Sequence, residues 1–287
     1  MKEAARRTSE SILGGATILI RPARGWSFAN LRELWRYREL IYFFIWRDVK
    51  VRYKQTLLVA GWAIIKPLLG MVIFTVVFAG LANLSTDGVA PPVFYFSGLL
   101  PWVLFQDGVT KAGNSLVASS NLITKVYFPR MAIPIALVIA GLVDFVLSFV
   151  VLIGMVVYYR MPLTSAAWLL PLFVGLALLA AMGVGLWLAA LNVYYRDVGY
   201  VMPFLLQAWL YASPVVYSTT LIPSGITGAL YGLNPMAGAV QGFRWAITGV
   251  AAPPIEMLLS SLLVGLFLLV SGVLVFRRME RVFADIV

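Results

Sequence analysis

Charged side chains inside apolar stretches are the first candidates for chemistry in this 287-residue chain. They are Lys66, Asp107, Lys111 and Asp144. Each needs a partner, because an unpaired charge in mid-membrane costs about 2.5–3.5 kcal/mol on insertion scales. Asp107 and Lys111 are four residues apart, which places them on one helical face, so we expect them to neutralise each other rather than contact a substrate. We expect Asp144 to face a neighbouring helix or a dimer interior, and Lys66 to reach toward the lipid headgroups.

The residue types that many enzymes use for acid–base or metal chemistry are absent. The sequence has no histidine and no cysteine, which removes the commonest general base, the commonest metal ligand and any disulfide. It also has no phosphate loop of the form GxxxxGKS or GxxxxGKT. We therefore predict no catalytic residue, no metal site and no cofactor in this chain. ATP and Mg²⁺ are expected on a separate partner subunit.

The composition is that of a membrane protein. Hydrophobic residues make up 61% of the chain and charged residues 12%, against about one quarter charged in soluble domains. Six stretches are long enough to cross about 30 Å of hydrocarbon. They are residues 58–82, 93–117, 132–158, 167–193, 198–217 and 255–276. We predict an all-α membrane protein with a six-span transmembrane domain over residues 58–276.

The net charge of +10 is concentrated beside the predicted spans. Residues 1–57 contain 12 of the 22 Lys and Arg residues, and others lie in the loop after the second span and in the tail 277–287. The opposite face has only Arg160 and Arg244. By the positive-inside rule both termini are cytoplasmic, and no nucleic acid is needed to explain the charge.

An amphipathic interface helix is predicted over residues 30–57, where Asn30 and Glu33 have the spacing of a helix-capping box. Basic residues recur there at spacings of three and four, opposite an apolar, tryptophan-rich face. We expect this helix to lie in the membrane interface; a surface helix packed on a soluble domain is the alternative. Its candidate functional residues are Trp35, Arg36, Glu39, Trp46 and Arg47. Residues 1–29 are predicted to form a cytoplasmic tail, because no cleavage site follows their short apolar run.

Two connecting segments have unusual compositions. The cytoplasmic loop 118–131 combines basic and apolar side chains, and we expect the apolar ones to be exposed and to dock a partner; a positive-inside anchor is the alternative. The predicted docking residues are Asn121, Leu122, Ile123, Thr124, Lys125, Val126, Tyr127, Phe128, Pro129 and Arg130. The outer segment 218–254 predicts short re-entrant helices broken around Asn234 and Pro235, since it is too interrupted to span and too apolar for a solvated loop. An ordinary extracellular loop packed on the bundle is the alternative there.

Four long segments resemble the membrane subunits of type two ABC exporters, which move O-antigen, capsular polysaccharide and teichoic acid. They are LWRYRELIYFFIWRDVKVRYKQTLLVAGWAIIKPL, FSGLLPWVLFQDGVTKAGNSLVASSNLITKVYFPR, NVYYRDVGYVMPFLLQAWLYASPVVY and LNPMAGAVQGFRWAITG. The resemblance implies a homodimer with two ATP-binding cassette subunits, and a coupling helix in NLITKVYFPR. It also implies that the first and fifth spans border the translocation channel and that the segment around Pro235 lies near the outer exit.

Aromatic residues are frequent in and near the predicted spans. Many belong to the interfacial belts that tryptophan and tyrosine form in any membrane protein. Others suit a glycan pathway, because sugar rings present C–H faces that stack on aromatic rings. By the resemblance, the channel candidates are Trp62, Lys66, Phe74, Phe78, Tyr211 and Tyr217.

The expected function is export of polyprenyl-linked polysaccharide, O-antigen first among them, across the bacterial inner membrane. Capsule or teichoic acid export is an alternative cargo for the same machine. An exporter of drugs or small lipids is the nearest rival. A membrane-embedded transferase is a third reading, and it would require catalytic acids such as Asp144 and Glu256.

Overall fold

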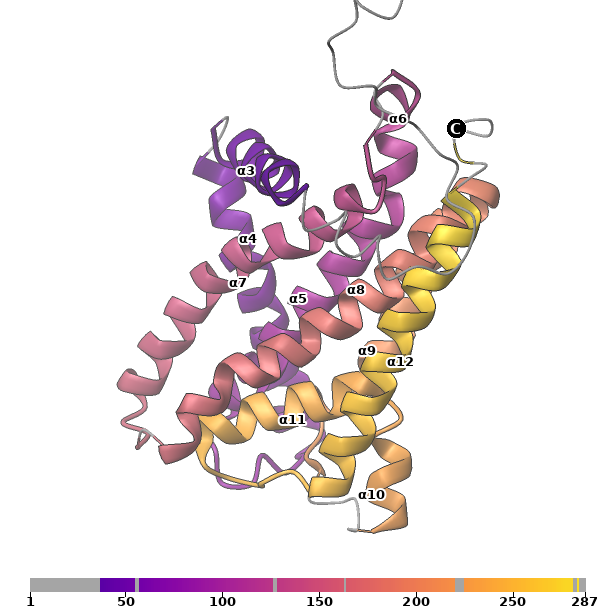
Figure 1. Ribbon diagram of the computed structural model, residues 1–287. Coiled ribbons are helices and arrows are strands. Elements are labelled where there is room, and N and C mark those ends of the chain that lie inside the picture. Colours follow the sequence, from indigo (N-terminus) through magenta and orange to yellow (C-terminus); the bar gives the residue numbers. More distant parts are fainter. Residues whose placement is uncertain are drawn as a thin grey trace, which may run out of the picture.

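The computed structural model of the protein describes residues 37–54, 57–125, 128–162, 164–219, 225–280 and 283, and these residues contain helices but no β-strand (Figure 1). The longer helices are α3 (Arg38–Lys54), α4 (Leu57–Phe74), α5 (Pro91–Ala118), α7 (Ala132–Tyr158), α8 (Leu170–Tyr194), α9 (Asp197–Ala212), α11 (Pro235–Thr248) and α12 (Ile255–Glu280). Short helices are α6 (Ser120–Lys125), α10 (Ile226–Tyr231), the π-helical η1 (Thr75–Leu81) and the 3₁₀ turn η2 (Ser165–Leu169). The predicted tail 1–29 and residues 30–36 of the predicted interface helix lie outside the described residues.

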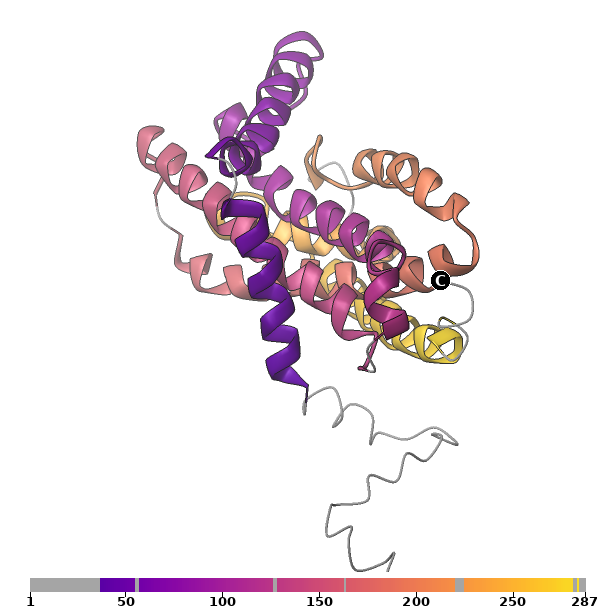
Figure 2. The same ribbon diagram turned by 90° about the horizontal axis from the view of Figure 1, so that it is seen from above.

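Helix α5 occupies the centre of the bundle. It packs along α7 and α8, α11 crosses it, and α12 covers the outer side of α8 (Figure 1). The start of α5 at Pro91 and Pro92 is expected, because proline suits the first turn of a helix, where its missing N–H is not needed. Helices α4 and α9 both pack on α5 at the periphery (Figure 2). More than half of the α5 side chains are buried by these neighbours.

Four helices in the described part of the chain are long and apolar enough to cross a membrane. They are Gly61–Leu81, Ala132–Tyr158, Ser165–Tyr194 and Ile255–Glu280. The predicted second span coincides with α5, which is long enough but includes Gln106, Asp107 and Lys111. The predicted fifth span, 198–217, is shorter than expected, since α9 has 16 residues and so extends about 24 Å. The six-span count is therefore not established by length and hydropathy alone.

The close contact between α8 and α12 depends on glycine. A Cβ on Gly272 would lie 2.6 Å from the carbonyl oxygen of Gly183, and a Cβ on Gly183 would lie 2.7 Å from the backbone of Leu268. Small residues at such positions let two helix backbones approach closely, which is the usual way for helices to associate in lipid. The α8–α12 pair is held by this backbone approach.

The predicted break at Asn234 and Pro235 separates α10 from α11. The Asn234 side chain accepts a hydrogen bond from the Met236 N–H, so it caps α11, and Gly249 ends that helix in the left-handed conformation. Helix α11 is almost entirely buried, although at 14 residues it is too short to span. The two short helices are thus present; their entry into the membrane stays a prediction.

The two ends of the bundle differ in what they carry. Helices α3 and α6 and the carboxyl end of α12 lie at the top in Figure 1, whereas α10, α11 and the loop before α5 lie at the bottom. Helix α3 lies across the top of the bundle and packs on α7 (Figures 1 and 2). The interface helix and the predicted coupling segment therefore share one end of the molecule.

Candidate functional site

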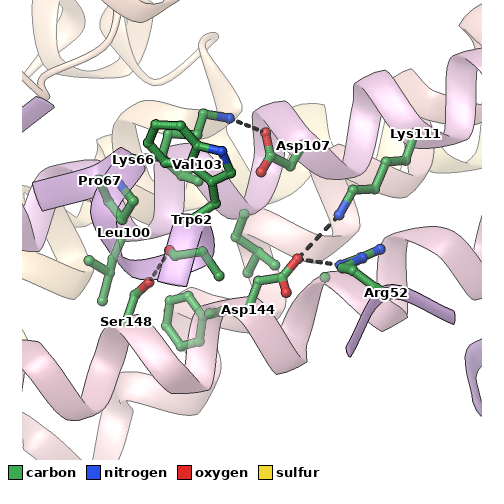
Figure 3. A pocket seen from close by; sticks show the side chains of 14 residues that line it. Arg52, Trp62, Lys66, Pro67, Leu100, Val103, Asp107, Lys111, Asp144 and Ser148 are labelled. Atoms are coloured by element: carbon green, nitrogen blue, oxygen red, sulfur yellow. Dashed lines mark hydrogen bonds and ion pairs between the residues drawn. The ribbon is translucent and has the colours of Figure 1, made fainter. Parts of the chain in front are cut away.

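A pocket of about 220 Å³ opens between α3, α4, α5 and α7 (Figure 3). It is lined by five of the residues that the sequence analysis selected for separate reasons, namely Trp62, Lys66, Asp107, Lys111 and Asp144. The remaining charged residue in its wall is Arg52 of α3, which the sequence analysis missed. The pocket is thus the place where the intramembrane charges meet the interface helix.

Asp144 of α7 is paired with residues of two other helices. Its carboxylate accepts hydrogen bonds from Arg52 of α3 and from the Lys111 ammonium of α5 at 3.2 Å (Figure 3). Tyr53 of α3 donates to the same carboxylate. Arg52 also pairs with Asp48, one helical turn earlier in α3. These bonds compensate the cost of a carboxylate in an apolar helix. Burial raises the pKa of the Tyr53 hydroxyl, and its bond to Asp144 raises that pKa further, so Tyr53 remains a donor.

The predicted pairing of Asp107 with Lys111 is wrong. Lys66 of α4 donates to Asp107 at 2.6 Å, while Lys111 turns to Asp144 (Figure 3). The same-face spacing is correct, but that face of α5 borders both α4 and α7, and each residue finds an opposite charge on the neighbouring helix. Lys66 is therefore held by an ion pair, although half of its side chain is exposed, and its reach toward the headgroups stays a prediction.

Ser148 lines the same pocket and compensates for a proline. Pro67 has no N–H and so leaves the Ala63 carbonyl without its helical donor. The Ser148 hydroxyl of α7 donates to that carbonyl at 2.9 Å. This bond satisfies a backbone group that lipid could not satisfy, and it joins α4 to α7 beside the charged residues.

A polar edge on α5 continues from the pocket and was also missed. Gln106 accepts from the Trp102 indole at 3.0 Å, the Thr110 hydroxyl donates to the Gln106 carbonyl, and Asn114 donates to the Thr110 carbonyl. Asn114 in turn accepts from Asn192 of α8. The i, i+4 spacing of Gln106, Thr110 and Asn114 is visible in the sequence, and could have identified this edge.

Residues 39–248 match the ABC-2 type transporter family, which covers most of the chain, including every helix that lines the pocket. The chain belongs to this family. As an ABC-2 transporter with several apolar helices, it is a multi-pass membrane protein and a transporter subunit.

Curated relatives of this ABC-2 transporter include proteins named as export permeases and one named as a transport protein. The O-antigen export system permease protein RfbA of Myxococcus xanthus is 28% identical over 256 residues, which are 89% of this chain and 98% of that protein. A protein of the same name from Klebsiella pneumoniae is 27% identical over 84% of this chain and 92% of its own length. The polysialic acid transport protein KpsM of Escherichia coli is 23% identical over 70% of this chain and 78% of its own length.

The predicted coupling segment of this ABC-2 transporter is less exposed than expected. Ile123 is only 4% exposed and Phe128 only 7%, because both pack into a cluster beneath α3. The Phe128 ring meets the Phe44 ring of α3 edge-on at 5.6 Å. Asn121, Thr124 and Lys125 are exposed, whereas Leu122, Pro129 and Arg130 are half-buried. Val126 and Tyr127 lie outside the described residues.

The two faces of α3 differ from the predicted pattern. Asp48 and Arg52 face the bundle, and Trp46, which belongs to the face expected to contact lipid, is 48% exposed. The Lys50 ammonium lies 4.2 Å from the centre of the Trp46 ring, and Arg47 lies over the Phe44 ring. Glu39 is exposed, and Trp35 and Arg36 lie outside the described residues. The inward face of α3 is polar at its carboxyl end, where Arg52 and Tyr53 donate to Asp144.

The predicted channel residues fall into two groups. Trp62 on α4 and Tyr211 on α9 are both more than half exposed. Phe74 and Phe78 instead pack edge-to-face at 5.4 Å against the core, and the Tyr217 hydroxyl shares a 2.6 Å hydrogen bond with Tyr231. Within one chain, the first group is available to a ligand or a partner.

Proposed function

We propose that this chain is the membrane subunit of an ATP-driven exporter of lipid-linked polysaccharide, with O-antigen as its cargo. The observation that carries the proposal is the match to a named O-antigen export permease over 89% of this chain and 98% of that protein. The exposed aromatic residues Trp62 and Tyr211 are compatible with a sliding glycan.

ATP hydrolysis is assigned to two separate cassette subunits. The chain has no phosphate loop, so ATP and Mg²⁺ would bind entirely on the partners. The exposed residues of α6 supply a contact surface at the same end as α3. Closure of the cassettes on ATP would move α6, and Phe128 would pass that displacement to α3 through Phe44.

The membrane arrangement we propose has six spans, with α5 and α9 as the second and fifth. Both termini are cytoplasmic in the bacterial inner membrane, and α10 and α11 are re-entrant at the outer side. Helix α5 does not need high hydropathy because other helices surround it. Helix α9 is short enough to require a partner at its end, and α10 and α11 lie there.

The complete transporter is proposed to be a homodimer. In α4 only 17% of the most apolar window is buried, and its outward face consists of large apolar residues. Helix α9 likewise exposes Tyr200, Phe204 and Tyr211. A second copy of the chain would place two such pairs around one path, which a single copy cannot enclose.

Reconstitution with the cassette subunit tests this function. In vesicles we expect polyprenyl-linked O-antigen to stimulate ATP hydrolysis, and ATP to move the polymer to a compartment that an added glycosidase cannot reach. A non-hydrolysable ATP analogue serves as the control and should abolish the movement. Stimulation by small apolar drugs but not by the glycan would reject the proposal in favour of a drug exporter.

Capsular polysaccharide is a second candidate cargo, supported by the similarity to KpsM. The same assay with a lipid-linked capsular polymer separates the two cargoes. A transferase has less support, because Asp144 is engaged with α3 at the top of Figure 1, whereas Glu256 lies in the first turn of α12 near the bottom. These two acids do not form one site.

A further inference from the structure

Four of the five charged residues that line the pocket form two ion pairs. Lys66 of α4 pairs with Asp107 of α5, and Lys111 of α5 pairs with Asp144 of α7 (Figure 3). Lys111 is one helical turn from Asp107, so a side-chain rotation brings it to either carboxylate. Asp144 does not depend on Lys111, because it also accepts from Arg52 and Tyr53.

We propose that this cluster is an ion-pair switch that couples the interface helix α3 to the outward movement of α4. In the closed arrangement Lys66 holds α4 against α5. When α4 leaves, Lys111 moves from Asp144 to Asp107, and α3 alone retains Asp144. Both carboxylates are paired in each arrangement, so α4 can move without leaving a bare carboxylate in a region of low polarity.

The direction of coupling follows from the sharing of Asp144. Arg52 and Lys111 bond to the same carboxylate oxygen, so a closer approach of α3 weakens the hold of Asp144 on Lys111. Lys111 is then released toward Asp107, where it competes with Lys66 for that carboxylate. A displacement of α3 toward α7 therefore favours separation of α4 from α5.

Contacts on the inward face of α3 connect the switch to the coupling segment. Phe44, Asp48 and Arg52 are spaced one turn apart, with Phe44 against Phe128 and Arg52 against Asp144. Arg130, two residues beyond Phe128, donates to the backbone carbonyl of Glu280 in α12 at 2.6 Å. This bond anchors the carboxyl end of the segment to α12. These contacts provide a physical route from the coupling segment to Asp144.

The inference rests on the proposed function, but its test has a readout of its own. The chain has no cysteine, so a Val103→Cys variant provides one thiol, in the pocket wall between α4 and α5. The rate at which a water-soluble maleimide labels this thiol in the intact complex reports the separation of α4 from α5. ATP hydrolysis with and without glycan is measured on the same samples.

Two substitutions should change the labelling rate in opposite directions. Lys66→Met removes the bond that holds α4 and should raise the rate about fivefold, whereas Lys111→Met leaves Asp107 without a partner after separation and should lower it about fivefold. Lys111→Arg should restore the original rate, and Arg160→Met, which alters an exposed cation outside the pocket, should not change it. If Lys111→Met does not assemble, Lys111→Gln tests the same step.

Changes in the same direction, or no change, would overturn the switch, since a purely structural role predicts that both losses loosen the pocket. Opposite changes without any stimulation of ATP hydrolysis by glycan would instead retain the switch and reject the proposed cargo. The two hypotheses can therefore fail separately.

Discussion

Arg244 is the most deeply buried charged side chain among the described residues, at 2% exposure. Its guanidinium donates to the carbonyls of Phe94 and Val215 and to Gln241, and lies 3.8 Å from the centre of the Phe94 ring. Gly98 leaves the space that it occupies. One side chain thereby joins α11 to α5 and to the turn after α9.

Loss of Arg244 should destabilise the protein. Arg244→Met would leave buried acceptors without their donor. We expect the free energy of unfolding to fall by about 3 kcal/mol, which would lower the midpoint of thermal unfolding in detergent. Arg160→Met is the matched control, because Arg160 lies at the same end and is exposed. An unchanged midpoint for Arg244→Met would mean that water or another donor replaces the guanidinium.

Single residues were predictable in kind but not in partnership. That Asp144 needs a cation follows from its apolar surroundings, whereas Arg52 is 92 residues away in sequence, and no local spacing connects the two. The pairing of Asp107 with Lys111 was the best local solution, and it lost to partners on neighbouring helices. Similarly, Phe128 looked exposed because α3 could not be placed over it.

Among the elements, the α8–α12 pair offers a direct test of packing. We expect Gly183→Ala to lower the free energy of unfolding by about 2 kcal/mol or more, because the new methyl group would collide with the α12 backbone. Gly175→Ala in the same helix is the control, since a Cβ there meets nothing within 4 Å. Chemical or thermal unfolding of both variants in detergent measures the difference. Equal midpoints would show that α12 can shift at little cost.

The bounds of the predicted spans match the helices to different degrees. The predicted span 132–158 has the same bounds as α7, since lipid contact requires continuous apolar residues. The predicted span 198–217 extends past the end of α9, because the turns that follow it are apolar as well and bury Val215. Hydropathy measures contact with lipid or protein and does not separate a helix from an apolar turn.

At the scale of the whole molecule, the orientation is the principal untested prediction. Single cysteines at Leu84 and Ala252 should react with a membrane-impermeant maleimide from outside, whereas Lys125→Cys and Arg278→Cys should react only after permeabilisation. All four positions are exposed, and the chain has no native cysteine to interfere. The prediction places four spans between residues 125 and 278, so both should be labelled from the same side. Labelling from opposite sides would contradict it.

The central position of α5 also has a consequence for biogenesis. Its polar edge at Gln106, Thr110 and Asn114, together with Asp107 and Lys111, makes it a poor substrate for the translocon when it emerges from the ribosome. The residues that neutralise or cover this edge belong partly to α7 and α8, which are synthesised later. We therefore expect stable integration of α5 to follow the synthesis of α7 and α8.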